Sequence, residues 1–147
     1  MAITRINPEE LHDTPGYHHV TVVEAGRLAF LAGQCPLDRA GRVVGPGDVE
    51  AQVDQVAANA AAALAAVGAA PDQVVRSVIY VVSADRAVLA AAWRRFAQSA
   101  IGPAFSTAST LVGVAQLGFP DQLLELDLTA ALPARTSPGR SRSARAP

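Results

Sequence analysis

The sequence predicts a single α+β domain in which two helices cover one face of a mixed β-sheet. Two segments have apolar residues at intervals of three and four, as amphipathic helices require. The segments around them are short and apolar or alternating, which is typical of strands. The chain has 147 residues, half of them hydrophobic, so it is long enough to bury one core.

The N-terminal part of the chain predicts strands. Residues 20–23 and 28–32 are apolar runs, and the connection Glu24-Ala25-Gly26-Arg27 between them is typical of a β-hairpin. A further strand is expected near residues 3–6. Residues 35–47 contain two prolines and three glycines, which indicates a loop.

The first helix is expected to begin after Asp48, an N-capping residue, and to end at Gly68. Gln52 is expected to lie away from the apolar face of this helix. The positions that form that face are Val49, Val53, Val56, Ala57, Ala60, Leu64 and Val67.

Residues 74–82 are nearly all β-branched or apolar, which predicts a central strand buried on both faces, with Tyr80 in the core. A second helix is expected from Ser83 or Asp85. Its inner face would consist of Val88, Leu89, Ala92, Trp93 and Phe96.

Two more strands are expected at residues 105–115 and 122–131. The last strand alternates: one face carries Leu124, Leu126 and Leu128, and the other carries Glu125, Asp127 and Thr129.

An uncovered sheet face predicts self-association. Two helices can cover only one face of the sheet, yet strand 74–82 places apolar residues on both faces. A subunit with an exposed apolar face buries it against copies of itself, so we expect an oligomer.

Composition narrows the classes of partner and the compartment. Four of the twelve basic residues, all arginines, lie in residues 133–147, where no acid occurs, so residues 1–132 carry about −5. An acidic body argues against nucleic acid as the main partner. One cysteine, Cys35, excludes an intramolecular disulfide and suits the cytoplasm. No signal peptide and no membrane span is evident.

The chain is expected to divide into one domain, residues 1–132, and a tail, residues 133–147. The tail mixes Pro, Arg, Ser and Gly with no apolar period, so it is expected to be disordered.

Four motifs resemble the RidA/YjgF family in order and spacing, over about residues 3–131. They are Pro15-Gly16-Tyr17, Leu31-Ala32-Gly33-Gln34-Cys35-Pro36, Val112-Gly113-Val114-Ala115-Gln116-Leu117 and Leu124-Glu125-Leu126-Asp127. The resemblance implies a chorismate-mutase-like α+β fold, a homotrimer, and small-molecule sites at the clefts between subunits.

Enzymes of this family hydrolyse reactive enamines and imines, such as 2-aminoacrylate, and hold the substrate carboxylate with an arginine. The resemblance places Ser109 at that position, and no arginine occurs between Arg95 and Arg135. A serine does not replace the bidentate, charge-assisted pair of a guanidinium with a carboxylate. Ordinary 2-imino acids are therefore expected to bind poorly, which favours an uncharged substrate or none.

The remaining site residues also follow from the resemblance. Glu125 would position the attacking water and Tyr17 would contact the substrate, as the catalytic pair. Leu111 and Ala90 take the places of a family cysteine and asparagine. The substrate-binding positions would be Ala32, Gly33, Gln34, Ser109 and Leu111.

The sequence leaves open whether the protein is an enzyme. The first hypothesis is a divergent hydrolase or deaminase with an altered substrate. The others are a non-catalytic ligand-binding trimer and a holdase-like module that uses the arginine-rich tail. No cofactor is expected. Neither is a metal, because His12, His18 and His19 do not form a convergent ligand set, and Cys35 is expected to be a packing residue.

Overall fold

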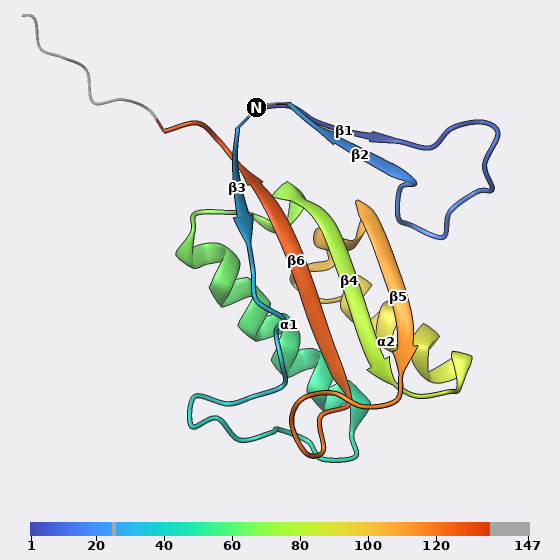
Figure 1. Ribbon diagram of the computed structural model, residues 1–147, viewed down its shortest axis with the longest axis vertical. Coiled ribbons are helices and arrows are strands. Elements are labelled where there is room, and N and C mark those ends of the chain that lie inside the picture. The colour runs from blue at the N-terminus through green and yellow to red at the C-terminus, as the bar shows by residue number, and fades with distance from the viewer. Residues whose placement is uncertain (25, 136–147) are drawn as a thin grey trace, which may run out of the picture.

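The computed structural model describes residues 1–24 and 26–135, and its elements follow the predicted order (Figure 1). Those elements are β1 (Ile3–Ile6), β2 (Val20–Val23), β3 (Arg27–Phe30), α1 (Val49–Ala66), the 3₁₀ turn η1 (Pro71–Gln73), β4 (Val74–Val82), α2 (Arg86–Ala97), the 3₁₀ turn η2 (Gly102–Phe105), β5 (Ala108–Val114) and β6 (Leu124–Leu132).

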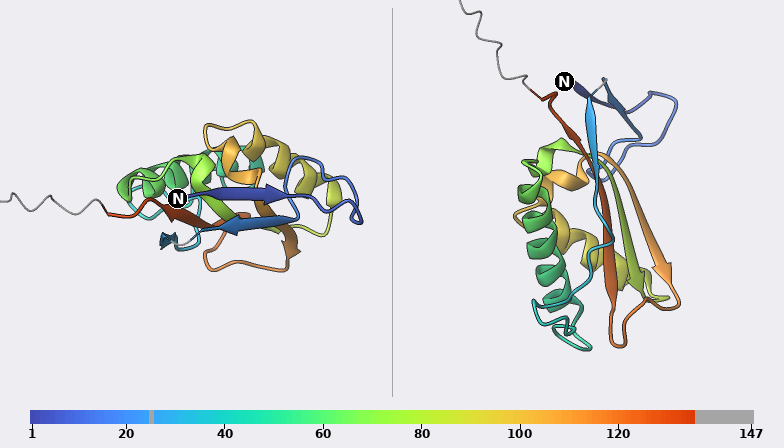
Figure 2. Two further views of the ribbon diagram at one scale, coloured as in Figure 1. Left: turned by 90° about the horizontal axis from the view of Figure 1, so that it is seen from above. Right: turned by 60° about the vertical axis from the view of Figure 1, so that its left-hand side comes forward.

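The main sheet has the strand order β3-β6-β4-β5. Strand β5 runs parallel to β4, whereas β6 runs antiparallel to both β4 and β3. Both helices pack on the same side of this sheet, and its other face has no helix on it (Figure 2). The predicted α+β arrangement, with two helices on one face of a mixed sheet, is confirmed.

The alternation of β6 puts its leucines in the core. Leu124, Leu126 and Leu128 are buried between the sheet and the helices, and Glu125 and Asp127 face the uncovered side. Helix α1 begins where the sequence predicts, because the Asp48 carboxylate accepts a hydrogen bond from the Ala51 amide at 3.0 Å.

Within one chain, strand β4 is buried on one face only, so the predicted burial on both faces depends on the expected self-association. Ser77, Ile79 and Val81 point into the core, while Val78 and Tyr80 are half-exposed on the other side. A β-bulge between Val74 and Arg76 shifts the register. Val74 therefore shares the core face with Ile79, which simple alternation does not allow.

The predicted hairpin of the second and third strands is wrong. Strand β2 pairs with β1, and β3 pairs with the edge of β6. The β1–β2 ribbon lies across the end of the main sheet (Figure 1), where Arg5 donates to the Asp72 carbonyl at 2.6 Å. A short glycine-containing connection turns the chain equally well into a new sheet, so the turn residues do not reveal the pairing.

Two positions of α1 differ from the amphipathic pattern. Val67 caps the C-terminal end of the helix and is exposed, and Gln52 is fully buried. The Gln52 amide donates to the carbonyls of Gly45 and Asp121 and accepts from the Leu123 amide, at 2.8–3.1 Å. Because these partners lie in two different loops, Gln52 connects the start of α1 to the start of β6.

In residues 1–24 and 26–135, no helix is long and apolar enough to cross a bilayer. Most of the predicted tail, residues 136–147, lies outside the described part of the chain.

Gln52→Leu is expected to lower the free energy of unfolding by about 2–4 kcal/mol, because it leaves three backbone groups without partners inside the protein. Urea denaturation would measure this change. Gln116→Leu is the matched control, since Gln116 is exposed. Equal stability of the two variants would contradict the role of Gln52.

Candidate functional site

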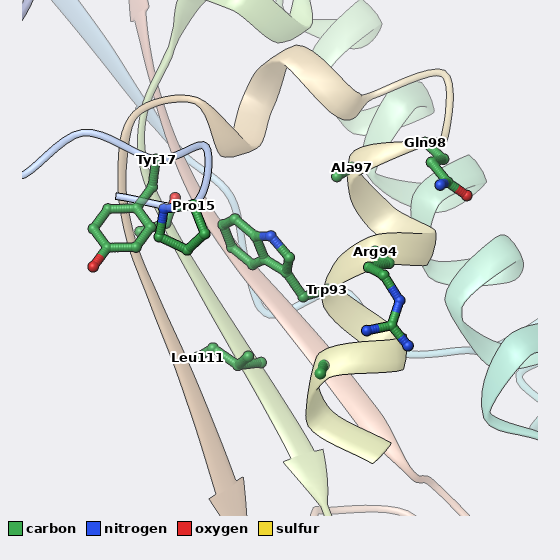
Figure 3. A pocket seen from close by; sticks show the side chains of 9 residues that line it. Pro15, Tyr17, Trp93, Arg94, Ala97, Gln98 and Leu111 are labelled. Atoms are coloured by element: carbon green, nitrogen blue, oxygen red, sulfur yellow. The ribbon is translucent and has the colours of Figure 1, made fainter. Parts of the chain in front are cut away.

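A cavity of about 560 Å³ opens on the helix side of the sheet, between the N-terminal loop, α2 and β5 (Figure 3). The residues that line it are Pro15, Tyr17, Ala90, Trp93, Arg94, Ala97, Gln98, Ser109 and Leu111. We call this the helix-side cavity. Its volume lies in the range of small-molecule sites.

Secondary structure explains which residues reach this cavity. The four lining residues of α2, together with its C-cap Gln98, are spaced as one stripe of an α-helix. Ser109 and Leu111 are two residues apart on β5, so they share one face of the strand. Tyr17 is held by three contacts: its carbonyl accepts from Thr14 Oγ1 at 2.5 Å, its hydroxyl lies 3.1 Å from His12 Nε2, and its ring meets Trp93 edge to face at 6.3 Å.

The Ser109 hydroxyl is bonded within the wall of the cavity. Its Oγ lies 2.5 Å from Ser77 Oγ and donates toward the carbonyls of Phe105 and Thr107. A serine nucleophile needs a neighbouring general base, and none of these partners is one. Ser109 therefore shapes the cavity without being activated.

A second cavity, of about 390 Å³, lies on the uncovered face of the sheet. We call it the open-face cavity, and Leu31, Gly33, Tyr80, Leu117, Glu125 and Asp127 line it. Tyr80 sits opposite Glu125 in the β4–β6 ladder. A Cβ atom at position 33 would collide with the Glu125 carboxylate where it now lies, so a larger residue there would displace this side chain. The carboxylate also accepts from Gln122 Nε2 at 3.2 Å.

The two cavities lie on opposite faces of one sheet. In the ladders, Ser109 is opposite Ser77 and Leu111 is opposite Ile79, whose side chains all face the helices. Glu125 belongs to the other face. Within one chain, Ser109 and Leu111 therefore do not share a space with Glu125.

The segment 32–35 divides between sites. Only Gly33 lines the open-face cavity, whereas Ala32 and Gln34 line a separate groove beside β3 and α1. Gln34 forms two backbone hydrogen bonds with Leu126, at 2.7 and 3.0 Å. This pairing presses the Gly33 backbone against Glu125.

Cys35 lies close to this acid. Burial raises the pKa of the Cys35 thiol, and the negative charge of Glu125 raises this pKa further. The thiol is therefore protonated at neutral pH and is a poor nucleophile.

The histidines form a local network. The rings of His12 and His19 meet edge to face at 4.6 Å, and His18 Nδ1 bonds the Ser106 carbonyl. Within the described residues, no group of three His, Cys, Asp or Glu side chains could hold a metal ion.

Sequence reasoning missed four site residues. Trp93 and Tyr80 were expected in the core, yet each is half-buried and lines a cavity. The sequence pattern alone assigns no role to Arg94 or Gln98. The spacing of 90, 93, 94 and 97 is a helical stripe, so a site residue at Ala90 could have suggested the others.

The fold and the cavities together define a small α+β protein with room for a small molecule on each face of its sheet. Solved structures of other proteins are similar to it. A solved member of the conserved Rid protein family, YyfB from Yersinia pestis, is 34% identical, covers 90% of this chain and 100% of its own, and superposes with a TM-score of 0.79. Rv2704 from Mycobacterium tuberculosis, of the YjgF/YER057c/UK114 family, is 26% identical with a TM-score of 0.58, over 89% and 100% of the two chains.

Protein DfrA from Myxococcus xanthus is 44% identical over 64 residues, which are 44% of this chain and about half, 49%, of DfrA. The family model described as Endoribonuclease L-PSP matches residues 10–132. The chain belongs to this family, the RidA/YjgF proteins.

Glu125→Gln is expected to lower the pKa of Cys35, because it removes the negative charge that disfavours the thiolate. The rate of alkylation by iodoacetamide at neutral pH should therefore rise, with its pH midpoint shifted downward. Asp127→Asn is the matched control, since Asp127 is not among the groups that shift this thiol. Equal rates in both variants would contradict the influence of Glu125.

Proposed function

We propose that this protein binds a small molecule at clefts between the subunits of a homotrimer. In this proposal it is a divergent hydrolase or deaminase that acts on a substrate other than the ordinary 2-imino acids. The observation that carries the proposal is the separation of the candidate site residues into two cavities on opposite faces of one sheet. A site that contains both sets requires the helix-side cavity of one copy to meet the open-face cavity of another.

The uncovered face of the sheet supports self-association. Phe30 on β3 is 77% exposed and Leu28 is 49% exposed. Val78 and Tyr80 of β4 are half-exposed on the same face, with β6 between them and β3. Exposure of large apolar side chains such as Phe30 and Leu28 is unfavourable in water. Packing this face against other copies would bury it and bring Glu125 into an interface.

In the proposed reaction, Glu125 positions a water molecule that attacks the carbon of an imine, and nitrogen leaves as ammonia or an amine. Gly33 lets the backbone approach the carboxylate closely, and Tyr17 of a neighbouring copy would pack on the substrate. The helix-side cavity presents no arginine from β5, since Ser109 stands at that position. In this proposal the hydrolysis of an imine is therefore retained, while the substrate differs from the ordinary 2-imino acids.

A non-catalytic ligand-binding trimer is the second candidate. It is favoured by the Ser109 hydroxyl, which is bonded within the cavity wall, and by the mainly apolar lining. A holdase-like interaction module is the third candidate, and it depends on residues 133–147. The printed name of the family refers to an endoribonuclease, but residues 1–132 carry about −5, which disfavours binding to phosphates. We place the protein in the cytoplasm.

Light scattering is expected to give a mass of about three times 15.1 kDa. Phe30→Glu should dissociate the trimer, because it buries a charge without a partner in the apolar interface. Phe119→Glu is the control, since Phe119 is exposed outside the sheet. A monomeric wild-type protein at micromolar concentration would overturn both the assembly and the shared cleft.

Hydrolysis of two- or three-carbon 2-imino acids, supplied by an amino-acid oxidase, is expected to be negligible. Ser109→Arg should raise this turnover at least about tenfold, a part of the gain that a carboxylate clamp can provide. The increase should disappear in the double variant Ser109→Arg, Glu125→Gln.

Gln116→Arg is the control, because Gln116 is exposed and lines neither cavity. A folded, trimeric Ser109→Arg protein without any gain would favour the non-catalytic candidate. Rapid hydrolysis by the wild-type protein would contradict the altered substrate.

A further inference from the structure

We propose that Arg94 anchors the carboxylate of a ligand with a bulky apolar body, an arylalkyl or branched alkyl acid, in the helix-side cavity. This inference rests on the proposed function only in taking that cavity as the ligand site. It moves the positive charge of the site from strand β5 to helix α2. It also replaces the uncharged ligand that the sequence favours with an anionic one.

Arg94 is the only charged residue among those that line the cavity. It lies one helical turn after Ala90, and long helical side chains point back toward the preceding turn. Figure 3 shows the Arg94 side chain running along α2 toward the N-terminal end of the helix. The methyl group of Ala90 leaves space there, so the guanidinium can serve the cavity from the helix.

The neighbouring arginine has a different role. Arg95 ties α2 to α1 through ion pairs with Asp54 at 2.7 Å and with Glu50 at 3.2 Å. Among the described residues, Arg94 forms no ion pair within 4.0 Å, and no carboxylate lines its cavity. A guanidinium in that setting favours a ligand that brings its own carboxylate.

The rest of the cavity favours an apolar ligand body. Trp93, Tyr17, Leu111 and Pro15 form its walls, and Figure 3 shows the Trp93 ring reaching from α2 toward Pro15 and Tyr17. A space of about 560 Å³ exceeds what a two- or three-carbon imino acid fills. An aromatic or branched group would cover these walls and gain from leaving water.

The chain offers a direct measurement, because Trp93 is its only tryptophan and lies in the cavity. We would titrate the full-length protein with 3-phenylpropanoate and with 3-phenylpropanamide, which match in shape and differ in charge, and follow Trp93 fluorescence. The acid is expected to bind at least about tenfold more tightly than the amide, which corresponds to ~1.4 kcal/mol. Added salt should weaken the binding of the acid but not of the amide. Acetate, which has no bulky apolar body, should bind most weakly.

Variants of two arginines on one helix assign the effect. Arg94→Gln should remove the preference for the acid and leave the affinity for the amide unchanged. Arg94→Lys should retain part of the preference, because a lysine keeps the charge without the planar fork. Arg86→Gln is the control: it makes the same charge change at the exposed first turn of α2, outside the cavity.

The outcomes separate this inference from the proposed function. Equal binding of acid and amide, or an unchanged preference in Arg94→Gln, would overturn the role of Arg94 while the cavity still binds ligands. Loss of the preference for the acid in Arg86→Gln would mean that the net charge of the protein causes the preference, which would also overturn the role of Arg94. Failure of every probe to change Trp93 fluorescence would overturn this inference as well. The mass of the assembly and the turnover of Ser109→Arg test the proposed function independently.

Discussion

The antiparallel pairing of β4 with β6 is the constraint on which the rest of the structure depends. Its register places Ile79 opposite Leu126 and Tyr80 opposite Glu125. Because side chains alternate along a strand, this one register sends the leucines of β6 to the helices and its acids to the uncovered face. A slip of one residue would bury Glu125 in the core and expose the leucines.

The same alternation distributes chemistry between the two faces. Strand β5 follows the register of β4, so Ser109 and Leu111 face α2, where a mainly apolar cavity with a single arginine is formed. The other face collects Glu125, Asp127 and the protonated thiol of Cys35. One chain therefore holds an apolar, cationic half and a polar, acidic half that point in opposite directions. Only self-association can make a single cleft from them.

The positive charge beside the helix-side cavity belongs to Arg94 on α2, and not to position 109 on β5. The resemblance puts an arginine at position 109, on a strand whose position the sheet holds rigidly. In this chain the charge stands on a helix that borders the same cavity. Ala90 and Ser109 are smaller than the asparagine and arginine that the resemblance implies, and Leu111 is more apolar than the implied cysteine. These differences suit the larger apolar ligand that we propose.

The sequence by itself determined the order of the elements, the Asp48 cap of α1, the alternation of β6 and the family motifs, because local spacing encodes each of these. It did not determine the partner of β2, the burial of Gln52 or the face of Val74, since these depend on contacts between distant segments and on a bulge in β4. Trp93 and Tyr80 read as core residues for the same reason: an apolar pattern shows that a residue avoids water, not whether it packs against the core or lines a cavity. Only the tertiary structure decided that Glu125 and Ser109 lie on opposite faces. Their registers pair Glu125 with Tyr80 and Ser109 with Ser77, which point to opposite faces of β4.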